Sequence, residues 1–224
     1  MMNDFKRFLL SLACLLLTAA AAVPPCVYAG TNLIRRPADE AYTDADTKLV
    51  FPSRWGGFIK MEVIRNLNPV FGTTIRYQNE NYSGADVYIY CLGTKGGPVS
   101  EEQFRAECAD VEKNILNMKQ RSDIIESVRL LDAGKTQDAG KAQAQAAGKI
   151  FRRSFEIVID GEKNRSTLLM FLYRGRIVKC RITFPDDSAE GAAASKEAAA
   201  FEDALLRGAG LKSAPQAVPV PSKP

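Results

Sequence analysis

The residue types that most often carry chemistry are sparse in this chain of 224 residues. It has no histidine, which excludes a Ser-His-Asp triad and a histidine-activated cysteine by composition alone. Cys91, Cys108 and Cys180 lie beyond the N-terminal region and are too far apart in sequence to suggest a metal cluster. We predict that they are buried small residues, and one disulfide among them is an open alternative.

Acidic and glycine-rich stretches give no stronger signal for catalysis. Residues 101–102 and 186–187 are acidic pairs at expected helix starts, where carboxylates interact favourably with the helix dipole. Ser195 and Lys196 are adjacent on an expected helix, so they do not face each other as a dyad. Residues 93–97 lack the spacing of a phosphate-binding loop. We predict no catalytic, metal or cofactor site, although separated acids of the glycosidase kind stay open as an alternative.

The first 29 residues predict export. Lys6 and Arg7 precede an apolar run over residues 8–23, and Val27-Tyr28-Ala29 offers the small residues that a signal peptidase reads. We predict a signal peptide over residues 1–29, cleaved near Ala29, and a periplasmic or cell-envelope location. An uncleaved anchor helix is the alternative, and only in that case do we expect contact with a membrane.

The overall charge is small. Cleavage near Ala29 removes two basic residues and one acidic residue, which lowers the formal net charge from +4 to +3. Such a balance does not predict a nucleic-acid partner. Apolar residues make up 46% and charged residues 25% of the chain, which is typical of a globular domain rather than a disordered one.

The segment Ser166–Tyr173 organises the expected fold. It carries no charge, and both sets of alternate residues are mostly apolar. Because strand side chains alternate between two faces, we predict a central strand that is covered on both faces. Gly175 permits a tight turn after this strand, so residues 176–184 are expected to return as the second strand of a hairpin.

This hairpin also contains the one candidate binding surface that the sequence offers. A two-residue turn pairs Phe171 with Val178 and Leu169 with Cys180 on the deeper face. It pairs Met170 with Lys179 and Leu168 with Arg181 on the other face, where long basic side chains can cover apolar neighbours while their charges reach water. The basic residues that make up the candidate are Arg174, Arg176, Lys179 and Arg181.

The remaining elements complete a mixed fold. Apolar patterns predict further strands over residues 58–65, 73–78, 85–92, 124–131 and 150–160. A capping box at Ser100 and Gln103 predicts a helix that runs to about Arg121, and Asp187 is expected to cap a last helix that ends at Gly208. We predict a single α+β domain with a mainly antiparallel sheet of about six to seven strands and helices packed on both faces.

Composition divides the rest of the chain. We predict a flexible lead-in over residues 30–46, the α+β domain over 47–210, and a disordered Pro-rich tail over 211–224. Within the domain, residues 132–149 are low in complexity and are expected to form a mobile loop, with a short Ala-rich helix as the alternative.

Three stretches together suggest a family resemblance. They are residues 51–58 with their paired glycines, residues 85–90 before a glycine and a capped helix, and residues 166–184 before the last helix. They resemble an uncharacterised family of exported bacterial proteins, and the order of elements is similar to Mog1/PsbP-like α/β/α sandwich domains. The resemblance covers most of residues 50–208. It implies an antiparallel sheet with helices on both faces and supplies no catalytic residues.

Three functional hypotheses follow. The first is a non-catalytic binding or accessory protein of the envelope, whose partner is another envelope protein or a small apolar ligand held between sheet and helix. The second is an enzyme with an unrecognised site. The third is a membrane-surface protein, held by an uncleaved N-terminal helix, whose basic hairpin faces anionic lipid.

Overall fold

The computed structural model describes residues 34–36, 39–66, 68, 70–81, 83–93, 96–131, 150–186 and 189–211. The predicted signal peptide, the low-complexity segment 132–149, the predicted cap at Asp187 and residues 212–224 lie outside this part of the chain. No helix in the described ranges is both long and apolar enough to cross a membrane.

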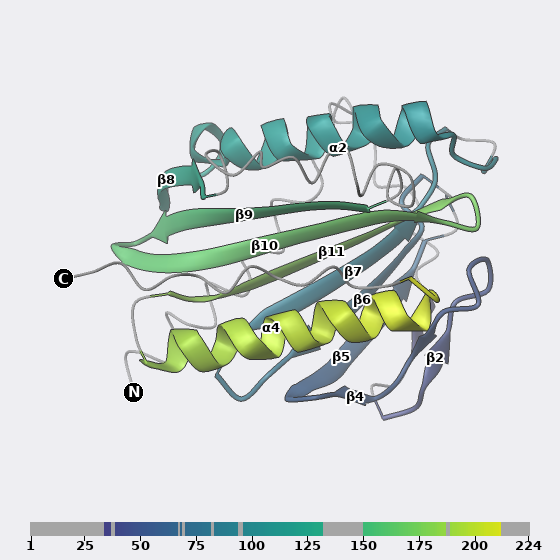
Figure 1. Cartoon of the computed structure of the whole chain (residues 1–224), viewed down its shortest axis with the longest axis horizontal. Coiled ribbons are helices and arrows are strands. Elements are labelled where there is room, and N and C mark those ends of the chain that lie inside the picture. Colours follow the sequence, from purple (N-terminus) through teal and green to yellow (C-terminus); the bar gives the residue numbers. More distant parts are fainter. Residues whose placement is uncertain are drawn as a thin grey trace.

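One large antiparallel sheet forms the centre of an α+β fold, as predicted (Figure 1). Its strands lie in the order β1 (Ile34–Arg36), β5 (Phe58–Arg65), β6 (Thr73–Gln78), β7 (Gly84–Tyr90), β11 (Arg176–Pro185), β10 (Glu162–Tyr173), β9 (Ile150–Ile159) and β8 (Ile125–Leu130). A ninth strand, β4 (Arg54–Trp55), pairs with β5, and β2 (Tyr42–Thr43) pairs with β3 (Val50–Phe51) in a separate ribbon. All seven predicted strands are present, and β1 and β4 extend the sheet beyond the predicted size.

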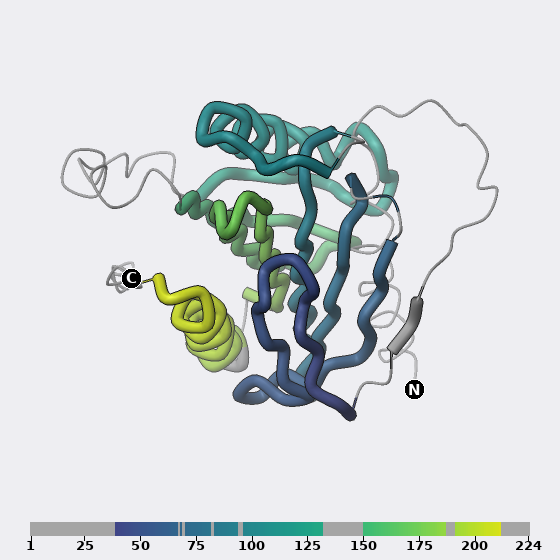
Figure 2. The backbone as a smooth tube through the Cα atoms, turned by 90° about the vertical axis from the view of Figure 1, so that its right-hand side faces the viewer, coloured from purple at the N-terminus to yellow at the C-terminus, as the bar shows by residue number. Residues whose placement is uncertain are grey.

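Two long helices accompany the sheet. Helix α2 (Glu101–Leu116) begins with the predicted capping box, in which Ser100 accepts from the Gln103 amide and the Gln103 side chain accepts from the Ser100 amide. A short 3-10 helix, η1 (Met118–Arg121), follows it. Helix α4 (Ala189–Gly208) ends the described part of the chain. Figure 2 shows strands β9 to β11 passing between the two helices.

Strand β10 is buried on both faces, although β7 and β11, not β10, lie in the middle of the sheet. Leu168 and Met170 belong to a core cluster that includes Phe104 of α2. Leu169 and Phe171 belong to another cluster, which includes Phe201 of α4. The alternation of the strand therefore supplies two cores, one under each helix.

The β10–β11 hairpin has the predicted register. Phe171 pairs with Val178 and Leu169 pairs with Cys180. The two turn residues, Arg174 and Gly175, both have positive φ, at 50° and 72°. This is the backbone that favours a two-residue connection between twisted strands.

Part of the predicted flexible lead-in is folded. Tyr42 is 6% exposed and packs in the core with α4 residues, and Asp44 is 4% exposed. The Asp44 carboxylate accepts from the Thr47 amide at 2.8 Å, which closes the turn between β2 and β3. Lys60 is fully buried and donates from Nζ to the Glu40 carbonyl. The folded domain therefore begins before residue 47.

Candidate functional site

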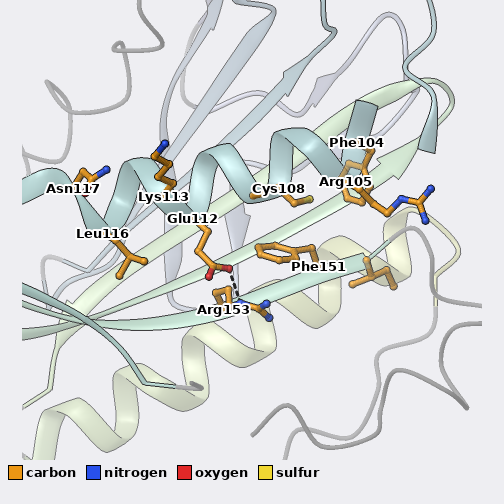
Figure 3. A pocket seen from close by; sticks show the side chains of 11 residues that line it. Phe104, Arg105, Cys108, Glu112, Lys113, Leu116, Asn117, Phe151 and Arg153 are labelled. Carbon is orange, nitrogen blue, oxygen red and sulfur yellow. Dashed lines mark hydrogen bonds and ion pairs between the residues drawn. The ribbon is translucent and has the colours of Figure 1, made fainter. Parts of the chain in front are cut away.

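A groove of about 720 Å³ lies between α2 and the first residues of β9 (Figure 3). Apolar side chains line it from both elements, with Phe104, Cys108 and Leu116 on the helix and Phe151 on the strand. Charged side chains also line it, and these are Arg105, Glu112, Lys113 and Arg153. Its volume is within the range of about 300–1,000 Å³ that is typical of ligand sites.

The helical side of the groove is a second face of α2. Phe104, Cys108 and Ile115 are buried against the sheet. Beside them, Arg105, Ala109, Glu112 and Leu116 follow at spacings of four, three and four residues, which places them along one side of the helix. Leu116 is 37% exposed although it is a large apolar residue. The apolar surface of α2 is therefore wider than its contact with the sheet requires.

One ion pair joins the two walls. The Arg153 Nε lies 2.7 Å from the Glu112 carboxylate, and the guanidinium carbon lies 4.5 Å from the centre of the Phe151 ring. Within the described residues, Arg105 and Lys113 have no ion-pair partner. Since Arg153 neutralises Glu112, the groove keeps an excess of positive charge above its apolar floor.

The cysteine of the groove is an apolar wall residue rather than a nucleophile. Cys108 is 4% exposed. Burial, followed by the nearby Glu107 carboxylate, raises the pKa of its thiol to about 12. The thiol is therefore protonated at neutral pH, and this groove offers apolar contact and cationic attraction but no activated nucleophile.

No group of three or more His, Cys, Asp or Glu among the described residues could hold a metal ion. Cys91, Cys108 and Cys180 are buried, and none of them forms a disulfide within the described part of the chain.

The structure separates the four residues of the predicted basic hairpin. Arg174 is in the turn, with its guanidinium carbon 5.4 Å from the Tyr173 ring centre. Arg176 pairs with Asp46 at 3.2 Å and donates to the Gly96 carbonyl at 2.9 Å. These contacts hold Arg176 against neighbouring loops.

The other two basic residues lie deeper than the hairpin pattern predicts. The Lys179 amine lies 4.4 Å from the Tyr88 ring centre and 5.6 Å from that of Tyr90. Arg181 is only 9% exposed and donates from Nε to the Ser166 hydroxyl at 2.9 Å. The expectation that the charge of Arg181 reaches water is therefore wrong, because η1 and Ser166 enclose it. The four residues do not form one exposed basic surface.

Sequence reasoning missed the groove itself. The available signal was the second side of α2, where Ala109 and Leu116 continue beside the buried stripe. The pairing of that side with Phe151 and Arg153 joins segments about forty residues apart and has no signature in either segment alone.

Comparison with known proteins adds little to this site. No protein-family model matches the chain, and no curated protein matches it. Among solved structures, the chain is similar to the solution structure of cyanobacterial PsbP (CyanoP) from Synechocystis sp. PCC 6803. The identity is 10% over 80% of this chain and 96% of that one, with a TM-score of 0.37. The match falls in the group that the element order resembles, and at this TM-score we draw no functional conclusion from it.

Proposed function

We propose that this chain is an exported, non-catalytic accessory domain that holds an apolar, negatively charged partner in the groove between α2 and β9. The observation that carries the proposal is the combination of an apolar floor with two cations, Arg105 and Lys113, that lack an acidic partner among the described residues. Desolvated apolar surface supplies affinity, and unpaired cations select for negative charge.

The export part of the proposal rests on the sequence of residues 1–29, which lie outside the described residues. A basic start, an apolar run and a small-residue cleavage site support a signal peptide. The non-catalytic part rests on the absence of histidine from the whole chain and on the raised thiol pKa of Cys108. The membrane-surface alternative has less support, since Arg176 and Arg181 are engaged within the fold.

Native mass spectrometry of the chain purified from its own envelope tests this proposal, with the denatured mass of the same sample as reference. Leu116→Asp places a carboxylate on the apolar wall, where burial of a charge is costly. Met61→Asp is the matched control, because Met61 is 52% exposed on β5, several strands away from the groove. We expect a non-covalent companion on the native chain and on Met61→Asp, and its loss from Leu116→Asp. If both variants retain the companion equally, the groove is not its binding site.

A further inference from the structure

Within the described residues, the first residues of β9 have a strand partner on one side only, and their other side lies beside the groove. In the part of the chain that the structure describes, strand β8 pairs with β9 from Ile159 back to Phe155, and a further bond runs from the Leu131 amide to the Ser154 carbonyl. Residues 150–153 pair with β10 on one side. No strand in the described part of the chain pairs with them on the other side.

The direction of the backbone groups at this edge follows from the ladder. In an antiparallel sheet, the amide and carbonyl of one residue point to the same side, and the side alternates along the strand. Since the Ser154 carbonyl points toward β8, the amides and carbonyls of Arg152 and Ile150 point outward as well. The Arg152 carbonyl accepts a bond from the Arg153 side chain at 2.9 Å, which agrees with this direction.

The side chains of Ile150 and Arg152 point to the other face of the sheet, toward α4. The Arg152 side chain turns toward α4, where Nε lies 3.6 Å from the Glu202 carboxylate and Nη2 lies 3.8 Å from that of Asp203. Ile150 packs against the core cluster under α4. Pairing with β10 holds residues 150–153 in an extended form before any partner arrives, which reduces the entropy lost on binding.

We propose that the partner is an extended peptide segment of another polypeptide, which adds to β9 as a strand along residues 150–153. This inference rests on the proposed function and names its ligand class. An added strand lies about 4.8 Å from β9, on the side where β8 has ended. Its alternate side chains then point under α2 into the groove. Its backbone bonds to the outward groups of Ile150 and Arg152, and at the Arg152 carbonyl it replaces the bond from the Arg153 side chain. The edge then supplies affinity while the groove supplies selectivity.

The charges define the side-chain pattern of this segment. Apolar residues at alternate positions fit the wall formed by Phe104, Leu116 and Phe151. Acidic residues at the two ends of the peptide face that carries these apolar residues can pair with Arg105 and Lys113. The competing interpretation is that Arg153 merely protects the edge by bonding to the Arg152 carbonyl, as charged residues commonly do in native sheets.

The test uses a synthetic peptide, acetyl-Glu-Thr-Leu-Thr-Leu-Thr-Glu-amide, whose one face carries two leucines between two glutamates. The control is the same peptide with N-methyl groups on its threonine amides, and a second control carries them on the leucine and glutamate amides. Because alternate amides of a strand point to opposite sides, one of the two methylated peptides must lose the amides that would bond to β9. Binding to the full chain is followed by amide and methyl NMR shifts. We expect shifts at Ile150, Arg152 and Leu116, and about tenfold weaker binding for one methylated peptide only, as the loss of one or two backbone bonds implies.

A pair of variants separates backbone pairing from side-chain contact. Ile150→Pro and Ile150→Ala both remove the isoleucine side chain, but only proline removes the outward amide. Proline is tolerated at the first residue of a strand. We expect Ile150→Pro to weaken peptide binding more than Ile150→Ala does. Equal binding by the two variants overturns strand addition.

The remaining outcomes distinguish this inference from the proposed function. If the amides of Ile150 and Arg152 resist hydrogen exchange in the chain alone, another part of the chain occupies the edge and the peptide inference is overturned. If dodecanoate shifts the Leu116 methyl groups and the peptide does not, the groove holds a small amphiphile; the proposed function then stands and the peptide inference fails. If neither probe shifts Leu116 and native mass spectrometry finds no groove-dependent companion, both fail.

Discussion

The Glu112 carboxylate on α2 lies 2.7 Å from the Arg153 Nε on β9, and this pair spans the groove from wall to wall. Both side chains are partly exposed, at 23% and 34%, so the attraction between them is screened by solvent. An acidic partner can therefore replace Glu112 as the ion-pair partner of Arg153 with little loss of interaction energy.

Glu112→Gln is expected to tighten binding of the acidic peptide, because it frees Arg153 and removes one negative charge from the groove. The expected gain is about two- to fivefold at low salt, in keeping with the strength of an exposed pair, and it decreases as salt is added. NMR titration at two salt concentrations measures it. Glu102→Gln, on the exposed first turn of the same helix, is the control. Equal gains from both variants show a general charge effect rather than competition in the groove.

The three thiols are expected to be inert in the folded chain. Cys91, Cys108 and Cys180 form no disulfide within the described residues and are no more than 4% exposed, and burial raises the thiol pKa of Cys180 as well as that of Cys108. Treatment with a maleimide, followed by mass measurement, is expected to add no label under native conditions and three labels to these residues in denaturant. Rapid native labelling of Cys108 contradicts the closed apolar wall described above.

Two glycines with the same backbone conformation are expected to respond differently to alanine. Gly56 and Gly72 have φ of 60° and 55°. A Cβ on Gly72 falls 1.9 Å from the Ile89 carbonyl oxygen, whereas nothing lies within 4 Å of one on Gly56. Gly56→Ala is expected to cost only the backbone strain, about 1 kcal/mol, and Gly72→Ala about 3 kcal/mol or more, since the β6–β7 backbone must shift. Urea denaturation of both variants measures the difference, and equal costs contradict the close approach.

Lys179 is expected to give the chain a pH-dependent stability. Burial lowers the pKa of its amine from 10.5 to about 8, with Arg181 adding to the decrease and Glu107 and Asp86 opposing it. Between these two pH values, the unfolded chain binds more protons at this position than the folded chain does. The free energy of unfolding contributed by Lys179 therefore rises as the pH rises from about 8 to 10.5.

Comparison with Lys179→Met isolates this contribution, because every other group titrates in both proteins. Below pH 8 the folded chain bears the full cost of the buried ammonium, and the contacts with Tyr88 and Tyr90 offset part of it. The free energy of unfolding of the native chain minus that of the variant is expected to increase between pH 8 and pH 10. Urea denaturation at several pH values measures this difference in the free energy of unfolding. If it stays constant between pH 8 and pH 10, burial does not lower the pKa of the Lys179 amine.

Much of the sheet could be predicted from local patterns. Strand β6 has the predicted bounds, and the β10–β11 register follows from a two-residue turn and the alternation around Leu169 and Phe171. Strand β10 begins earlier than predicted, at Glu162, because Asp160 and Gly161 alone form the preceding turn, with φ of 50° and 79°. The apolar pattern did not predict this extension, because residues 162–165 are polar. They are held in the sheet by backbone pairing with β9 and not by hydrophobic side chains.

The groove could not be predicted in the same way. Its walls come from α2 and β9, and the contact between Glu112 and Arg153 depends on how the helix lies over the sheet. Arg181 illustrates the same limit: a basic residue on a strand usually reaches water, but here η1 and Ser166 cover it. Local periodicity predicts which face of an element is apolar, and it does not predict what covers the end of a polar side chain.

The central claim is that a partner binds in the groove between α2 and β9. Amide hydrogen exchange of the chain, measured before and after its bound companions are removed, tests this claim most directly. The chain is purified natively from its envelope, and half of the sample is denatured, freed of non-covalent companions and refolded. If a partner occupies the groove, stripping is expected to speed exchange in residues 105–117 and 150–154 while leaving β5 and β6 unchanged. Identical exchange in both samples, in a preparation whose native mass shows a companion, places that companion elsewhere and contradicts the groove as the binding site.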